Sequence, residues 1–187
     1  SAMCWAALDR LAQLHAHFRE PAASLWRTRA DTVRARVLER GWSDKLGSFV
    51  DVYDGSGADA SLLLLPEIGL VAYDDPRFLG TLAFLERRLR RGDFLARYDR
   101  ADDFGAPTVA FNLCTFWYIN ALAGVGRMDE ARQLFESMLA RCNHVGLLSE
   151  DIDPGSGELW GNFPQTYSLV GIVNAAMRLS KPWESAL

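Results

Sequence analysis

The stretch VAFNLCTFWYINALAGVGRMDEARQLFESMLARC, residues 109–142, places two different helical patterns next to each other. Its first half is apolar on every face, which is the pattern of a helix buried on all sides. After a short GVGR connection, residues 128–142 carry apolar side chains on one face and charged side chains on the other. That second pattern is typical of a helix that covers a core and meets solvent, so the stretch predicts an inner helix followed by an outer helix.

The same alternation extends through the chain. Patterns of buried helices begin near residues 3, 59, 109 and 166, and amphipathic helices over residues 24–41, 76–92 and 128–142 separate them. Asp59 is expected to be a helix N-cap more than a ligand, and Pro66 interrupts the second buried pattern. Alternating inner and outer helices can close into a double-layered ring. We therefore predict an all-α fold with about seven major helices, four of them in the inner layer of an incomplete (α/α) toroid.

The connections agree with this architecture. Those that lead into inner helices are long and rich in Gly, Asp and aromatic residues, whereas those that leave them are short. Long loops at one end of a rigid scaffold are where functional sites usually form. The alternative is a helical repeat module for protein interaction, since residues 126–140 alone match a tetratricopeptide helix. No second copy lies 34 residues away, which is the period of that family, so this alternative is disfavoured.

Length and charge limit the possible functions. A chain of 187 residues, 49% of them hydrophobic, suits one domain over residues 1–187. A net charge of −4 and a pI near 5.4 argue against a nucleic-acid groove or a basic membrane surface. A neutral ligand or a protein partner fits better.

The cysteines and the apolar runs bear on the cellular compartment of the protein. Cys4, Cys114 and Cys142 are odd in number and lie in helical patterns, so we expect buried thiols in a reducing, cytoplasmic environment. No apolar run approaches the roughly 20 residues of a membrane span, and no secretory signal pattern is present. Because Ser1 already lies within a helical pattern, we expect the chain to be part of something longer.

Residues 146–171, GLLSEDIDPGSGELWGNFPQTYSLVG, crowd carboxylates, glycines and a tryptophan between two helical patterns. The DPGSGE segment is a turn sequence, and Glu158 is expected to face water. Glu150 differs because the apolar lead-in VGLLS would carry it toward the interior of the ring. A carboxylate beside apolar walls is a candidate general base. A helix-capping or salt-bridged glutamate is the alternative at this point.

Four segments of the chain resemble a known family. They are AMCWAALDR (residues 2–10), DASLLLLPEIGLVAYDDPR (59–77), NLCTFWYINALAGVGRMDEARQLFE (112–136) and LLSEDIDPGSGELWGNFPQTYSLVGIVNAA (147–176). Together, in order and with similar spacing, they resemble the carboxy-terminal half of bacterial glucoamylase and trehalase-like enzymes, glycoside hydrolase family 15. The resemblance implies part of an (α/α)6 toroid of the six-hairpin glycosidase type.

The resemblance also implies a reaction. The family hydrolyses α-glucosidic bonds with inversion, which requires a general acid and, on the opposite face of the sugar, a general base that activates water. The position of the family's base falls on Glu150 of LLSED. The family's acid would lie a short way upstream of Ser1, so the resemblance implies half of the catalytic pair within these residues and an α-glucoside or oligosaccharide as substrate.

Four further positions are candidates for substrate binding. Trp160 could stack on a sugar face or pin its loop to the scaffold. Asn162 and Gln165 could bind hydroxyl groups, although such residues often satisfy loop backbone instead. Relatives frequently carry a carboxylate where this chain has Thr108, and a histidine where it has Leu169; these departures bear on the substrate and leave the fold unaffected.

The sequence indicates no metal site and no cofactor, because its three histidines and three cysteines lack ligand spacing and it has no phosphate-binding glycine loop. Two hypotheses remain. The chain is part of an inverting glycosidase, or it is a catalytically inert helical piece that acts by association. In either case, half a toroid would leave apolar flanks exposed, and self-association is expected.

Overall fold

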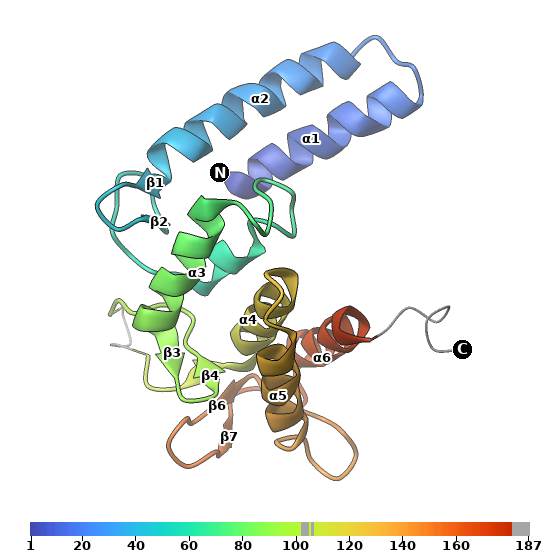
Figure 1. Cartoon of the computed structure of the whole chain (residues 1–187). Helices are drawn as coiled ribbons and strands as arrows, with labels where there is room; N and C mark the ends of the chain where they lie inside the picture. The colour runs from blue at the N-terminus through green and yellow to red at the C-terminus, as the bar shows by residue number, and fades with distance from the viewer. Residues whose placement is uncertain (102–104, 106, 181–187) are drawn as a thin grey trace.

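The computed structural model describes residues 1–101, 105 and 107–180, and helices dominate this part of the chain (Figure 1). The α-helices are α1 (Ala2–His17), α2 (Ala23–Arg40), α3 (Pro76–Leu89), α4 (Asn112–Gly124), α5 (Met128–Leu139) and α6 (Thr166–Leu179), with a 3-10 helix, η1 (Ala60–Leu64), between α2 and α3. Short antiparallel strands connect the helices. β1 (Trp42–Ser43) pairs with β2 (Ser48–Phe49), and β3 (Arg90–Arg91) pairs with β4 (Phe94–Leu95). In a three-stranded sheet, β6 (Asp151–Ile152) lies between β5 (Ala110–Phe111) and β7 (Leu159–Trp160).

The predicted pairing of inner and outer helices is confirmed for the segment that suggested it. Helix α4 contacts η1, α5 and α6, and eight of its residues are buried. Its amphipathic neighbour α5 buries Ala131, Leu134 and Met138 and turns its charged residues outward. Gly171 lets α6 lie close against α4, because a Cβ at this position would lie 2.5 Å from the Phe116 ring of α4. The elements follow one another along an open arc (Figure 1).

One predicted helix is wrong. The buried pattern that begins at Asp59 forms only the five-residue η1, followed by turns. Pro66 has no N–H to donate back to the preceding turn, so an α-helix cannot continue through it. Asp59 is the N-cap, as expected, and its carboxylate accepts a hydrogen bond of 2.8 Å from the Ser61 N–H.

The three long loops meet at one end of the helices. They span residues 41–59, 90–111 and 140–165 and lead into η1, α4 and α6. The first two are joined by a bridge between Asp59 and Tyr98 and by a 2.8 Å bond from the Ala60 N–H to the Arg97 carbonyl. The second and third share the β5-β6-β7 sheet. The loops therefore form a continuous rim, as the prediction of loops gathered at one end requires.

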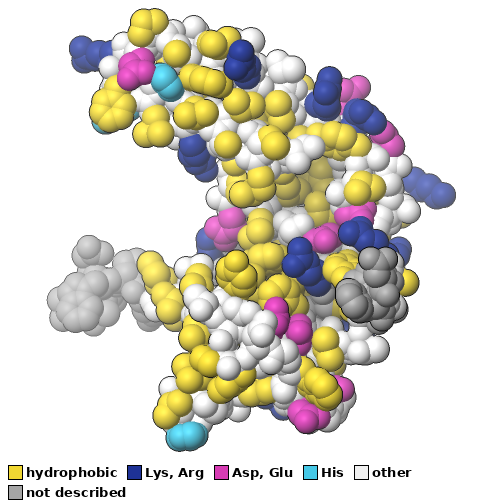
Figure 2. Space-filling view, turned by 180° about the vertical axis from the view of Figure 1, so that it is seen from behind, with side chains coloured by type: hydrophobic (Ala, Val, Ile, Leu, Met, Phe, Trp, Pro, Cys, Tyr) yellow, Lys and Arg dark blue, Asp and Glu magenta, His cyan; other side chains and the backbone are white. Residues whose placement is uncertain are grey.

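Two of the predicted inner helices are less buried than expected. Helix α1 exposes Met3 and Leu14, and α6 exposes Val173 and Met177, at 57% and 72%. Figure 2 shows apolar side chains gathered on the arm that α1 and α2 form and around the hollow below it. Among the described residues, nothing covers these faces. For the same reason Cys4 is exposed, contrary to prediction, whereas Cys114 is buried and Cys142 half-buried.

The exposed apolar faces of α1 and α6 predict that copies of this chain associate with one another. We expect residues 1–187, produced alone, to form oligomers, because apolar surface in water costs about 25 cal/mol per Å². The double change Val173→Glu and Met177→Glu should shift the weight-average mass in sedimentation toward the monomer. Gln133→Glu, which adds a charge to the exposed side of α5 without removing apolar surface, should not. A clean wild-type monomer at high concentration would contradict this expectation.

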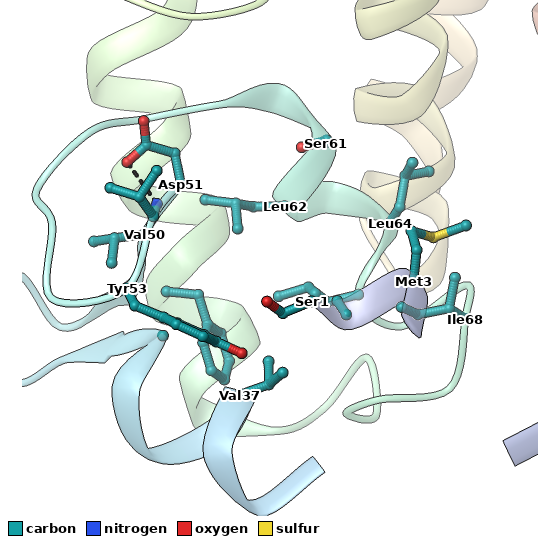
Figure 3. Close-up of a pocket in the computed structure, with 15 residues that line it drawn as sticks. Ser1, Met3, Val37, Val50, Asp51, Tyr53, Ser61, Leu62, Leu64 and Ile68 are labelled. Carbon is teal, nitrogen blue, oxygen red and sulfur yellow. Dashed lines mark hydrogen bonds between the residues drawn. The ribbon is translucent and has the colours of Figure 1, made fainter. Parts of the chain in front are cut away.

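A mainly apolar hollow of about 430 Å³ lies between the start of α1, the end of α2 and η1 (Figure 3). Its walls include Met3, Val37, Leu62 and Ile68. The carboxylate at its rim, Asp51, is paired with Arg100 and accepts a bond from the Val52 N–H. Among the lining residues Asp51 is the one carboxylate, and because it is paired, the hollow offers no free carboxylate and is not the candidate site. Within the described part of the chain, every helix is too short or too polar to cross a lipid bilayer.

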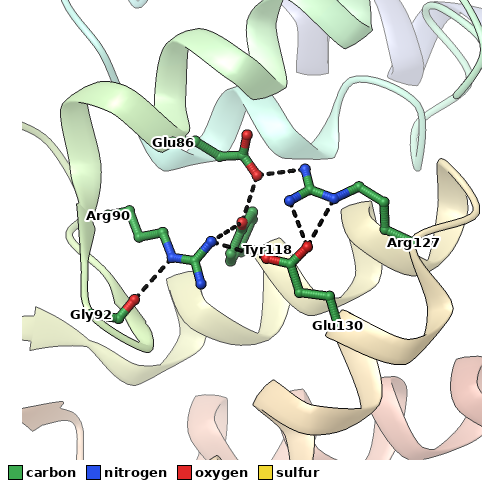
Figure 4. A network of polar contacts seen from close by, with 6 residues as sticks. All are labelled: Glu86, Arg90, Gly92, Tyr118, Arg127 and Glu130. Atoms are coloured by element: carbon green, nitrogen blue, oxygen red, sulfur yellow. Dashed lines mark hydrogen bonds and ion pairs between the residues drawn. The ribbon is translucent and has the colours of Figure 1, made fainter.

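A polar network ties α3 to α4 and α5 (Figure 4). The Tyr118 hydroxyl, on α4, donates to Glu86 of α3 at 2.6 Å and accepts from Arg90 at 3.1 Å. Arg127 and Arg90 both reach Glu130 on α5, and Arg127 also bonds Glu86. Burial and the Glu86 carboxylate raise the pKa of Tyr118 well above its usual value, so the hydroxyl stays protonated.

Removing this hydroxyl should cost stability. We expect Tyr118→Phe to lower the free energy of unfolding by about 1–2 kcal/mol, since it removes one hydrogen bond from each of two half-buried charged groups, Glu86 and Arg90. Tyr167→Phe removes the same atom from an exposed residue of α6 and should change stability by less than about 0.5 kcal/mol. Urea denaturation of both variants measures the difference. Equal effects would mean that the network adds no stability.

Candidate functional site

The loop that carries Glu150 is held by the first residue of α4 and by α6. The Ser149 carbonyl accepts a 2.9 Å bond from Asn112 Nδ2 and a 2.7 Å bond from Ser168 Oγ. The Asn112 backbone N–H, which has no partner inside α4, donates to the Glu150 carbonyl at 3.0 Å. Asn112, Ser149 and Ser168 are all buried, so these bonds are shielded from competing water.

The Glu150 carboxylate is fixed from the opposite side of the loop. Its Oε2 atom accepts from Asn162 Nδ2 at 2.8 Å and from the Asn162 N–H at 3.1 Å. The Glu150 N–H in turn donates to the Asn162 carbonyl at 2.9 Å. Neither the helix cap nor the salt bridge that the sequence left open is present, because the carboxylate contacts only these donors within the described chain.

Asp151, the next residue, is a second carboxylate at the same place. A Cβ atom on Gly161 would lie 3.0 Å from Glu150 Oε2 and 3.1 Å from Asp151 Oδ2, so the two carboxylates converge beside this glycine. Gly161 also has a φ of +77°, a conformation that side chains disfavour. Burial, and next the charge of Glu150, raise the pKa of Asp151 to about 6.

Both carboxylates line one cleft. It has a volume of about 240 Å³, and its other walls are Arg97, Tyr98, Pro107, Val109 and Phe111. These residues come from the segment after β4 and from β5, so all the loop segments that meet here belong to the rim described above. The Arg97 guanidinium lies 6.0 Å from the centre of the Phe111 ring and forms no ion pair with any described carboxylate. The cleft thus combines two anions, one cation and aromatic surface.

The other predicted site residues are not part of the cleft lining, but three of them neighbour residues that are. Trp160 is 53% exposed and is the cross-strand partner of Asp151. Thr108 is exposed between the two cleft residues Pro107 and Val109. The Gln165 side chain accepts a 3.3 Å bond from the Tyr167 N–H and caps α6. Asn162 contacts Glu150, so among the predicted binding residues it is the one that holds the predicted base.

Sequence reasoning missed Asp151, Arg97 and Gly161. Asp151 lies before the predicted turn sequence, residues 153–158, and received no predicted role. The turn itself is confirmed, because the Asp153 carboxylate accepts from the Gly155 and Ser156 N–H groups. A signal for Arg97 exists, because it directly follows the buried segment FLA and opens a loop toward an inner helix. Nothing in the sequence signals that Gly161 is where the carboxylates meet. No group of three His, Cys, Asp or Glu side chains among the described residues is placed to hold a metal ion.

Gly161 offers a test of this geometry. We expect Gly161→Ala to lower the free energy of unfolding by at least about 1 kcal/mol more than Gly146→Ala. Gly146 has a similar φ of +80°, but a Cβ there meets nothing within 4 Å, so it isolates the backbone cost of about 1–2 kcal/mol. Chemical denaturation measures both variants. Equal losses would show that the carboxylates move aside freely.

Known proteins are similar to this chain over nearly its whole length. The model of the family described as glycosyl hydrolases family 15 matches residues 1–177. A trehalase of Thermoplasma volcanium is 37% identical over 96% of this chain, and a trehalase of Mycobacterium tuberculosis is 34% identical over 98% of it. The chain covers 29% and 28% of these two relatives, so it spans less than a third of their length. The relatives include archaeal as well as bacterial proteins.

Solved structures share the fold. A glycosidase variant in complex with glucose superposes with a TM-score of 0.79 over 95% of this chain and 50% of its own, at 22% identity. A second variant of a glycosidase gives a TM-score of 0.77 over 92% of this chain and 48% of its own, at 23% identity. The predicted fold, all-α and part of a six-hairpin (α/α)6 toroid, is therefore correct.

Proposed function

The chain belongs to family 15 of the glycosyl hydrolases, and on that premise we propose that it is the carboxy-terminal half of a catalytic domain that hydrolyses α-glucosidic bonds. Trehalose is the first substrate to test, because the two relatives described above and a third one, which is 32% identical, are all called trehalases. Starch-derived oligosaccharides, the substrates of a glucoamylase, are the second. The observation that carries the proposal is the Glu150 carboxylate held by Asn162 at a cleft on the loop rim.

Glu150 is proposed as the general base. Its free oxygen would accept a proton from a water molecule while the water oxygen forms a bond to the anomeric carbon. The bond from that carbon to the glycosidic oxygen breaks, and the leaving oxygen takes a proton from a general acid. Attack from the face opposite the leaving group inverts the configuration. The two bonds from Asn162 keep one oxygen of Glu150 fixed, so that the other has a defined direction.

Asp151 is not a suitable general acid, although its pKa near 6 would permit it to carry a proton. Its Oδ2 atom and Glu150 Oε2 lie 3.1 Å and 3.0 Å from one point beside Gly161. An inverting pair flanks the glycosidic bond at roughly 6.5–9.5 Å, which leaves room for sugar and water. Neighbouring residues that converge reach the sugar from one side only. We therefore propose that the acid belongs to the other half of the catalytic domain.

Other residues of the cleft suit a sugar. Arg97 presents N–H donors and has no carboxylate partner among the described residues, so it can bind hydroxyl groups. Trp160 is 53% exposed, lies opposite Asp151 in the strand pair, and could stack on a sugar face. Thr108 and Gln165 stay candidate binding residues. The family match gives no support to the alternative of an inert interaction module.

Glu150→Gln in the full-length enzyme tests the assignment. The amide keeps the shape and still accepts from Asn162, but it cannot take the proton, so we expect kcat to fall by at least about 10²-fold. KM and the melting temperature should change little. Hydrolysis of trehalose and of α-glucosyl fluoride gives the rates. The fluoride yields a single glucose, so proton NMR of its hydrolysis by the wild type shows whether that glucose is released as the inverted β-anomer.

Glu158→Gln is the matched control, since Glu158 is exposed in the same loop. It should leave kcat unchanged. Full turnover in Glu150→Gln would remove Glu150 from the mechanism, and an α-anomer as the first product from α-glucosyl fluoride would exclude inversion.

A further inference from the structure

The apolar hollow beside the start of α1 exposes side chains of a kind that usually packs against others. Its volume is about 430 Å³, and Phe49 and Leu65 form buried parts of its wall. Met3 and Val52, which also line it, are 66% and 58% exposed. Apolar side chains on several sides of one concave space favour an apolar occupant, because both surfaces then leave water.

In a longer chain, the residues directly before Ser1 begin in this hollow. Ser1, Ala2 and Met3 belong to its lining. Figure 3 shows Ser1 between Tyr53 and Ile68. Consecutive Cα atoms lie about 3.8 Å apart, so a residue attached to Ser1 starts within the hollow. The first N–H groups of α1 have no partner within the helix, and the Ser1 side chain caps none of them in the described chain.

The charges at the edge of the hollow are already paired. Asp51 forms an ion pair with Arg100. Arg40, whose guanidinium lies 5.1 Å from the centre of the Tyr53 ring, forms an ion pair with Asp54. A charged side chain that entered the hollow would lose water without gaining an opposite charge. The hollow therefore suits apolar side chains.

The hollow and the cleft share one stretch of the rim. The N–H of Ala60, which precedes the lining residue Ser61, donates to the Arg97 carbonyl at 2.8 Å. Arg97 and Tyr98 line the cleft. Glu150, in contrast, belongs to the loop before α6, and α1 and α6 lie in different parts of the arc (Figure 1). A segment seated in the hollow thus reaches the rim next to the cleft, away from the loop that carries Glu150.

We propose that the hollow is the docking site of the segment that directly precedes Ser1 in the full-length enzyme, and that apolar side chains of this segment fill it. This inference rests on the proposed function, in which the general acid belongs to the other half of the catalytic domain. The segment before Ser1 is the part of that half that the chain itself connects to this rim. Its docking fixes how the two halves meet at the cleft, and with it the spacing of acid and base that inversion requires.

Cross-linking in the full-length enzyme identifies the occupant. The photoreactive amino acid benzoylphenylalanine in place of Tyr53 keeps an aromatic side chain in the hollow and, on irradiation, bonds to a neighbouring C–H group. Peptide mass spectrometry should place the cross-link on a residue before Ser1. The same probe in place of Leu79, which is 44% exposed on α3 and outside the hollow, should not give this product.

Other cross-linking results would overturn the inference. A bond from position 53 to a different part of the chain would assign the hollow to another segment. A bond to a second copy would make it a contact between protomers. No cross-link at all would leave the hollow open to solvent or to a small apolar molecule.

The double change Met3→Glu and Val52→Glu tests what the docking does. Two charges in the hollow should displace the segment, whereas a glutamate in the first turn of α1 suits the helix dipole. Fluoride leaves with little help from a general acid, but a sugar leaving group needs the proton. We therefore expect kcat/KM to fall at least about 10-fold for trehalose and less than about 3-fold for α-glucosyl fluoride. A starch-derived oligosaccharide takes the place of trehalose if the wild type does not hydrolyse trehalose.

Leu79→Glu is the matched control, because it places the same charge on an exposed apolar residue outside the hollow. It should leave both rates unchanged. Met3→Gln, which keeps the length of the side chain without a charge, should change the ratio of the two rates in the same direction but less. Equal losses on both substrates, or no loss on either, would overturn the inference. Full turnover in Glu150→Gln would instead defeat the proposed function, and the cross-linking result is independent of activity.

Discussion

The site depends on one buried carbonyl. The Ser149 oxygen accepts hydrogen bonds from Asn112 at the start of α4 and from Ser168 in the first turn of α6, so one atom joins two inner helices to the loop between them. The next carbonyl, of Glu150, satisfies the first N–H of α4. Because unpaired polar groups are costly when buried, these bonds leave the loop a single path. That path brings the Glu150 side chain to the cleft.

The same arrangement explains why the cleft lies at the rim. Each long connection enters an inner element, and the connections pair with one another through short strands and bridges. The helices provide rigid starting points, while the loops supply Arg97, Phe111, Glu150 and Asp151. At the other side of the arc, the exposed apolar residues of α1 and α6 mark faces that a closed ring would cover. The cleft on the rim and the exposed apolar faces are thus two results of one architecture.

Within the site, packing and charge have opposite requirements. The carboxylates could be spread apart with less repulsion, but Gly161, with its positive φ and no side chain, lets both approach the space that a Cβ atom would occupy. Asn162 stabilises the charge of Glu150 alone. The outcome is a Glu150 carboxylate held in place by hydrogen bonds beside Asp151, whose pKa burial and repulsion raise. Such separation of two neighbouring acids is a common way to assign them different chemical roles.

The sequence by itself determined the alternation of buried and amphipathic helices, the long loops on one rim and Glu150 as the proposed base, because hydrophobic periodicity and an apolar lead-in are local properties of the chain. It failed at η1, where Pro66 outweighed the apolar pattern, and at α1 and α6, whose burial depends on what covers them. Only the tertiary structure showed that Asn162 binds Glu150 and that Asp151 and Arg97 share its cleft. These contacts join residues on different loops and strands, and no local pattern specifies how loops lie against each other.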